Sequence, residues 1–435
     1  MNRRLGSVDR EILALAVPAL GALAIDPLLT LADTAFVARL GTIELAALGV
    51  DAAILTLAFF AFNFLSFVLT PLVAKALGKG ETEDAKRYVG TALVLAGLLG
   101  VVMTVVVELA APAFVSAMGA EGDVALAAVG YLRIRALATV AVLVVTAGHG
   151  AFRGHRDTKT PFVVALGVNG LNLVLDPLLI FGLDMGLEGA AIATVAAQWV
   201  GAIWFLRLIS RRGMAKAPRN LAESLPTLLT LGRNGGLLVV RTVFLLAAFT
   251  FAASTATRLG PVEIAAHQLV AQLFLLSAML ADAFEVAAQA MIADETGRGT
   301  AASIHALAKR LLRWGVAVGV ALLVLVGVGR YGLRLLASDT VVGEMAVEAA
   351  GVAALLEPVG ALVFVADGIF VGLLAIGTMA FSTASGAVVA IALMQWTPMG
   401  DSLNGIWWSL GVFLALRGVV FLAGYRRSVE TAVRS

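Results

Sequence analysis

Apolar runs of about twenty residues recur from one end of this 435-residue sequence to the other. A helical run of this length crosses the roughly 30 Å hydrocarbon core of a bilayer. Any other lipid-exposed backbone would leave amide groups without hydrogen bonds, at several kcal/mol each. The composition agrees, because 60% of the residues are hydrophobic and only 14% are charged. We therefore expect an all-α integral membrane protein.

Polar breaks divide the sequence into twelve expected transmembrane helices. They cover residues 11–37, 45–73, 89–117, 124–151, 160–183, 187–208, 227–257, 264–293, 308–329, 344–372, 376–397 and 404–424. An even number of spans places both termini on the same side of the membrane.

The basic residues indicate which side that is. With a cytoplasmic N-terminus, the inner segments hold 23 Lys and Arg residues, and the outer segments hold four: Arg39, Arg258, Arg330 and Arg334. Four more lie inside or at the edges of spans and are not counted: Arg133, Arg135, Arg241 and Arg417. Under the positive-inside rule this asymmetry predicts that both termini are cytoplasmic. We expect a multi-pass protein of the cell inner (plasma) membrane.

The two halves of the chain resemble each other. Residues 39–47 match residues 258–266 at an offset of 219, and Gly78–Gly80 matches Gly297–Gly299 at the same offset. Residues 150–154 match 368–372 at an offset of 218, and residues 187–189 match 403–405 at 216. Four matches in the same order at a nearly constant offset indicate a tandem repeat of six helices.

The repeat predicts two pseudo-symmetric six-helix bundles in the same orientation. We expect an N-terminal lobe at 1–209, a cytoplasmic inter-lobe linker at 210–226 and a C-terminal lobe at 227–435. Transporters built this way place their site between the repeats and alternate its access. The arrangement favours a transporter over an enzyme or a passive channel.

Polar side chains inside the first bundle form a candidate ion-coupling site. Asp33 lies in the first span and Thr194 in the sixth, while Asn172 and Asp176 share one face of the fifth because they are four residues apart. A charge in the centre of a membrane helix costs from about 2.5 to more than 10 kcal/mol, so it persists where it is paired, hydrated or used. Two carboxylates, an amide and a hydroxyl can hold protons or Na⁺.

Each of these residues also has a structural interpretation. Asp33 would then be a solvated residue at the outer mouth, and Asp176 with Pro177 would simply end a helix. Thr194 would bond the carbonyl one turn before it, as membrane threonines commonly do.

A second polar group belongs to the second bundle. It consists of Gln268, Gln272, Asp282, Glu285 and Asp367. These residues are candidates for lining a substrate cavity and attracting a cationic compound. The alternative is structural pairing of the acids with one another or with Arg241.

Enzymatic and cofactor chemistry find no support in the sequence. It has no cysteine, and its four histidines are scattered. No HExxH, GxSxG or phosphate-binding loop pattern is present. We expect no enzymatic activity and no cofactor. The net charge of +2 gives no reason to expect a nucleic-acid partner.

The order and spacing of several motifs resemble the multidrug and toxic compound extrusion (MATE) family, in its DinF-type branch. They are Pro18, Asp33-Thr34, Arg39–Gly41, Gly78–Gly80, Phe152–Pro161, Asn172 and Asp176-Pro177. The resemblance implies export of cationic or amphipathic organic compounds in exchange for H⁺ or Na⁺, by alternating access.

In that branch the N-terminal lobe binds the coupling ion, and four residues match its functional positions: Asp33, Asn172, Asp176 and Thr194. The same four would be the ligands of Na⁺. The NorM-type branch instead uses an acid on the seventh helix, but no Asp or Glu lies between Thr227 and Thr257 here. That difference puts an ion site in the C-terminal lobe in question.

The expected partners are small organic substrates and membrane lipid, and we expect the chain to act as a monomer. An alternative within the same superfamily is a flippase for lipids or lipid-linked oligosaccharides. Such a cavity needs inward-facing basic residues, whereas the acids within the spans outnumber Arg241 and Arg417.

Overall fold

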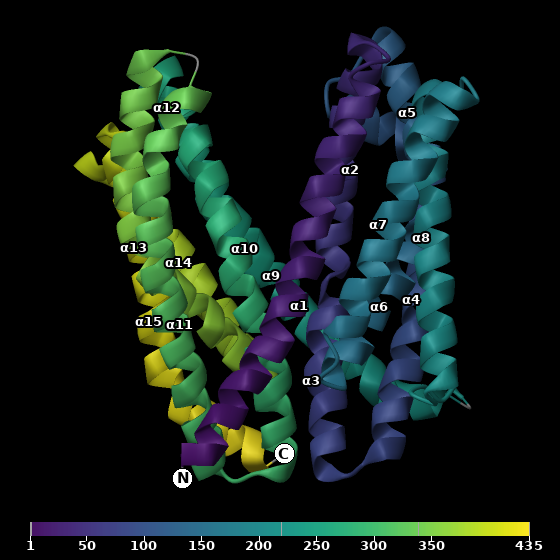
Figure 1. The fold of residues 1–435 in the computed structure, drawn as a ribbon, viewed down its shortest axis with the longest axis vertical. Coiled ribbons are helices and arrows are strands. Elements are labelled where there is room, and N and C mark those ends of the chain that lie inside the picture. The colour runs from purple at the N-terminus through teal and green to yellow at the C-terminus, as the bar shows by residue number, and fades with distance from the viewer. Residues whose placement is uncertain (1, 219, 338, 435) are drawn as a thin grey trace. The chain divides into compact units, whose positions relative to one another are not determined.

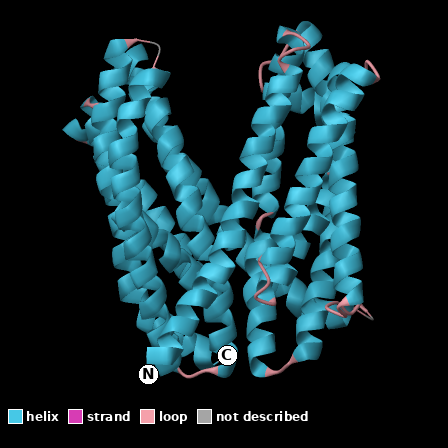
Figure 2. Cartoon of the chain, in the orientation of Figure 1, coloured by secondary structure: helices cyan, strands magenta, loops and turns pink. Residues whose placement is uncertain are grey.

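The computed structural model describes residues 2–218, 220–337 and 339–434. Within these ranges the chain is helical and contains no strand (Figure 2). The helices of the first half are α1 (Asn2–Val37), α2 (Thr42–Phe62), α3 (Phe64–Lys79), α4 (Thr82–Ala117), α5 (Gly122–Ala136), α6 (Thr139–Gly154), α7 (Lys159–Pro177), the π-helical turn η1 (Leu178–Gly182) and α8 (Gly186–Arg211).

The second half continues with longer helices. They are α9 (Leu221–Leu259), α10 (Pro261–Arg298), α11 (Ala301–Gly329), the 3₁₀ turn η2 (Arg330–Gly332), α12 (Leu333–Leu336), α13 (Thr340–Gly372), α14 (Ile376–Trp396), the 3₁₀ turn η3 (Pro398–Asp401) and α15 (Leu403–Arg434).

Among the described residues, 10 helices are long and apolar enough to cross a membrane, or 11 when α5 and α6, bent by 50°, count as one span. The remaining expected span, 45–73, forms α2 and α3 and includes residues 56–61, whose side chains lie outside the described part of the chain. The predicted all-α membrane fold is confirmed.

The chain forms two compact units. The N-terminal unit comprises Gly21–Gly235, and the C-terminal unit comprises Gly236–Ser435 together with Met1–Leu20. These bounds differ from the expected lobes at both junctions. The first half of α1 belongs to the C-terminal unit, and the expected linker is part of the N-terminal unit.

An ion pair explains why the start of α1 belongs to the C-terminal unit. Nε of Arg310 on α11 donates to Oδ1 of Asp9 at 2.6 Å, and a second guanidinium nitrogen contacts Oδ2. Nε1 of Trp314, one turn further along α11, donates to the same carboxylate at 2.9 Å. This contact could not be predicted from spacing in the sequence, because Asp9 lies 301 residues before Arg310.

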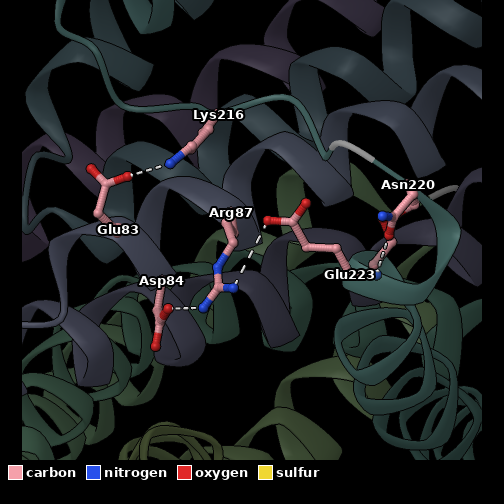
Figure 3. A network of polar contacts seen from close by, with 7 residues as sticks. Glu83, Asp84, Arg87, Lys216, Asn220 and Glu223 are labelled. Atoms are coloured by element: carbon pink, nitrogen blue, oxygen red, sulfur yellow. Dashed lines mark hydrogen bonds and ion pairs between the residues drawn. The ribbon is translucent and has the colours of Figure 1, made fainter.

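Polar contacts with the start of α4 attach the linker to the N-terminal unit (Figure 3). Nζ of Lys216 lies 2.7 Å from a carboxylate oxygen of Glu83, and its backbone N–H donates to the carbonyl of Lys86 at 3.0 Å. Arg87 pairs with Asp84 and lies 3.9 Å from Glu223. The linker thus lies along the cytoplasmic end that we expect for α4.

The helices of the two units begin and end at matching positions. From Thr42 to Lys79, α2 and α3 correspond to α10 at an offset of 219 at both ends. The range of α4 corresponds to residues 301–336 at the same offset, and α5 with α6 corresponds to α13 at 218. The backbone agrees locally, because Gly41 and Gly260 have φ of 157° and 155°, which residues with a side chain rarely adopt.

The two units differ in whether corresponding helices are continuous or interrupted. The N-terminal unit breaks its helix at Asn63 and again at 137–138, whereas α10 and α13 run through the corresponding positions without a break. Within the N-terminal unit, α7 packs against α8 and α4 against α6 (Figure 1). The broken helices therefore belong to the unit that carries the candidate ion-coupling residues.

Substitution of Gly90 tests the docking of the linker. A Cβ at Gly90 would overlap the backbone carbonyl of Lys216, whereas nothing lies within 4 Å of a Cβ at Gly97 on the same helix. We expect Gly90→Ala to destabilise the protein by about 1–3 kcal/mol and to speed tryptic cleavage at Lys216. Gly97→Ala should be neutral or stabilising by up to about 1 kcal/mol. Thermal unfolding and limited proteolysis measure both; equal behaviour of the two variants would contradict this packing.

Candidate ion-binding site

Two carboxylates from different helices meet inside the N-terminal unit. Asp33 lies near the end of α1, and Asp176 lies in the last turn of α7. The two carboxyl groups come within hydrogen-bonding reach of each other. Pro177 ends α7 and has no N–H to donate to the carbonyl one turn earlier, and the chain continues as the π-helical turn η1. The two carboxyl groups predicted from the sequence therefore meet where α7 ends and η1 begins.

The pair is almost devoid of hydrogen-bond donors. Asp176 is 1% exposed, and neither of its oxygens accepts a hydrogen bond from the described residues. One buried oxygen of the half-buried Asp33 also lacks a donor. Two carboxylates cannot hydrogen-bond to each other unless one carries a proton. Buried charge of this kind requires a proton or a cation to offset it.

Asn172 lies beside Asp176, one turn earlier on α7. The side chain is 1% exposed and its amide is near the Asp176 carboxyl. Its Nδ2 makes no hydrogen bond of regular geometry within the described part of the chain. The predicted face of α7 therefore carries an amide and a carboxyl that both have unused hydrogen-bonding capacity.

Thr194 follows its structural interpretation. Its hydroxyl donates to the carbonyl of Ala190, one turn earlier on α8, at 3.0 Å. The hydroxyl oxygen keeps its lone pairs, so this bond leaves it able to accept a hydrogen bond or coordinate a cation. Its role in ion coupling stays a prediction.

Sequence reasoning missed two charged groups and a tyrosine of the same cluster. Asp51 on α2 is 0% exposed, and neither of its oxygens accepts a hydrogen bond from the described residues. Arg135 on α5 acts electrostatically on Asp33, Asp51 and Asp176, and Tyr131 one turn earlier is close to the same carboxylates. Both charges carry a local signal, since Asp51 lies inside an apolar run and Arg135 lies inside the expected span 124–151.

The proposed cavity residues of the C-terminal unit divide into exposed and buried groups. Gln268 and Gln272 are exposed on α10, and Asp282 is half-buried. Glu285 is 4% exposed, with Oε1 lacking a hydrogen-bond donor among the described residues. Whether these residues contact substrate stays a prediction.

Asp367 on α13 is held in an ion-pair network. Nη2 of Arg417 on α15 lies 2.7 and 2.5 Å from the two carboxylate oxygens, and Nη2 of Arg241 on α9 lies 3.0 Å from Oδ2. Asp367 is 0% exposed and Arg417 is 1% exposed. This arrangement is the structural pairing that the alternative interpretation expects, and a role for Asp367 in a substrate cavity stays a prediction.

Two repeats of membrane helices with a pair of carboxyl groups inside one of them are typical of transporters that couple substrate movement to an ion. A family model described as MatE matches residues 18–178 and 238–396. The chain belongs to the MATE family of multidrug and toxic compound efflux transporters, as its sequence predicts.

Individual relatives agree over nearly the whole chain. Protein DETOXIFICATION 44, chloroplastic, of Arabidopsis thaliana is 34% identical, over 95% of this chain and 81% of the relative. DNA damage-inducible protein F of Escherichia coli (strain K12) is 28% identical, over 97% of this chain and 93% of the relative. The crystal structure of the Vibrio cholerae MATE transporter VcmN in the bent form has the same fold, with a TM-score of 0.91 at 20% identity over 98% of both chains.

The unpaired state of Asp176 predicts an unusual effect on stability. In Asp176→Asn the new amide can donate to Asp33 and one buried charge disappears, so we expect stabilisation by about 1–3 kcal/mol. Thermal unfolding of the detergent-solubilised protein measures it. A lower melting temperature in this variant would contradict the described environment of Asp176.

Asp157 provides the matched control. Its carboxylate accepts bonds from Thr160 Oγ1 at 2.6 Å, from the Thr160 N–H at 2.8 Å and from Arg212 Nη1 at 2.8 Å. Partial burial works in the opposite direction, but these bonds hold the pKa of Asp157 below its ordinary value. Asp157→Asn should therefore lower the melting temperature, opposite in sign to the change at Asp176.

Proposed function

We propose that the protein is a secondary active exporter that antiports cationic or amphipathic organic compounds against H⁺ or Na⁺ by alternating access. The observation that carries the proposal is the pairing of the half-buried Asp33 with the buried Asp176, neither of whose oxygens accepts a hydrogen bond from the described residues. The substrate class draws support from relatives such as the probable multidrug resistance protein NorM of Thermotoga maritima, 28% identical over 45% of this chain.

The energy of one coupling ion is sufficient for modest uphill export. A potential of about 100 mV supplies about 2.3 kcal/mol for each charge moved across the membrane. One unit of pH difference supplies about 1.36 kcal/mol for each proton. We propose that Asp33 and Asp176 bind the ion from outside and release it inside. We also propose that the protein lies in the inner membrane with both termini in the cytoplasm.

The first helix, α1, can convert ion binding at Asp33 into a movement of the helix. Asp33 lies on α1 in the N-terminal unit, while residues up to Leu20 of the same helix belong to the C-terminal unit, where Asp9 is bound by Arg310. A change in the direction of α1 at Asp33 is therefore transmitted along one continuous helix. Pro18 and Pro27 lack the N–H that would otherwise stiffen this helix.

The flippase alternative receives less support. Its cavity requires basic side chains that are free to meet an anionic headgroup. In the C-terminal unit, however, Arg417 and Arg241 both bind Asp367. We propose that the chain functions as a monomer, with small organic compounds as its substrates.

Proteoliposomes with separately imposed pH and Na⁺ gradients test the proposal. We expect efflux of a fluorescent organic cation to follow one of these gradients. Asp33→Asn should insert normally and reduce gradient-driven efflux at least about tenfold, because the pair then has only one ionisable member. The control is Asp123→Asn, which removes an exposed carboxylate from the first turn of α5 in the same unit. Efflux that needs neither gradient, or that survives in Asp33→Asn, refutes ion coupling at this site.

A further inference from the structure

A guanidinium inside the carboxylate cluster distinguishes this ion site. Charged residues within membrane helices are rare, and arginine is always ionised in proteins. Arg135 acts electrostatically on Asp33, Asp51 and Asp176, and its Nε and Nη1 are buried without a hydrogen-bond acceptor among the described residues. The guanidinium thus acts on these carboxylates without forming an ion pair with any of them among the described residues, whereas Arg417 in the other unit is paired with Asp367.

The repeat gives independent support for this clustering. At the offsets observed between the units, Asp33, Asp51 and Arg135 correspond to Ala252, Val270 and Ala353. These three apolar residues are fully buried and belong to one hydrophobic core cluster of the C-terminal unit, as does Ala349 at the position of Tyr131. Because the helices of the two units correspond, we expect the same positions of the N-terminal unit, where the side chains are polar, to face one common interior.

We propose that Arg135, balanced by Asp51, is a resident cation of the site and makes it select H⁺ over Na⁺. This inference rests on the proposed antiport at Asp33 and Asp176. It adds two residues to the site and names the coupling ion.

Electrostatics and coordination geometry explain the selectivity. Na⁺ is bound through several oxygens that share its charge, and a fixed positive charge among those oxygens repels it in a medium of low dielectric constant. A proton bonds covalently to a single carboxyl oxygen and needs no coordination shell. Asp51 adds a third carboxylate, so the guanidinium does not cancel the negative charge that attracts the proton.

Arginine on the same helix supplies a matched control. Arg133 lies two residues before Arg135, is half-exposed, and lies 3.8 Å from Glu108 on α4. Arg133→Gln removes the same charge outside the carboxylate cluster. Arg135→Lys keeps the charge at the cluster but changes the shape of the side chain.

Equilibrium binding of radioactive sodium to the purified protein tests the proposal without requiring transport. We expect weak binding by the wild type, binding at least about tenfold tighter in Arg135→Gln, and wild-type behaviour in Arg133→Gln and Arg135→Lys. The gained sodium binding should disappear when Asp33→Asn is added to Arg135→Gln.

Three results overturn the proposal. They are wild-type sodium binding as tight as that of Arg135→Gln, an equal gain in Arg133→Gln, and a gain in Arg135→Lys. If Arg135→Gln does not fold, the wild type is compared with Asp33→Asn and with the double variant Asp51→Gln/Arg135→Met. Tight sodium binding by the wild type that Asp33→Asn abolishes refutes the proposal, and weak binding by the wild type together with tighter binding by the double variant supports it. A protein that fails to export organic cations but excludes sodium in this way refutes only the proposed function.

Discussion

The hydrocarbon core of a membrane offers no hydrogen bonds. This constraint determines the fold, and it also requires each buried charged side chain to be neutralised by a partner or an ion. The backbone satisfies it by being helical throughout the described membrane-spanning segments, with turns and short loops between most of the helices. The side chains satisfy it in two ways. Asp367 is neutralised permanently by Arg417 and Arg241, whereas Asp176 is equally enclosed but has no donor within the described residues. A carboxylate of the first kind fixes helices together, and one of the second kind has capacity left for an exchangeable ion.

Sequence predicted what depends on local patterns. The expected spans follow from apolar length, and the tandem repeat follows from matches at an offset of 219 that the helix ends reproduce. Asn172 and Asp176 were predicted to share a face because four residues make about one helical turn. The choice of Asp33 as their partner came from family resemblance together with its place in a span, and the structure brings it to Asp176.

Contacts between distant parts of the sequence could not be predicted in the same way. Arg417 reaches Asp367 across 50 residues, and Arg310 reaches Asp9 across 301, so neither pair has a spacing that a helix would reveal. The second contact places the start of α1 in the C-terminal unit, which no boundary in composition marks. Asp51 differs from these cases, because a lone acid in an apolar run is a local signal. Its significance, however, depends on Arg135, which lies three helices further along the chain on α5.

The two repeats differ in the polarity of corresponding positions, and the polar positions belong to the N-terminal unit. Where the C-terminal unit has a core that includes Ala252, Val270 and Ala353, the N-terminal unit has Asp33, Asp51 and Arg135. The same unit interrupts its helices at positions where α10 and α13 are continuous. Interrupted helices free backbone groups that must be satisfied by side chains, water or ions, so breaks and polar residues are expected to occur together. The C-terminal unit has no such requirement at these positions, where its residues are apolar, and the Asp9–Arg310 contact attaches the start of α1 to this unit.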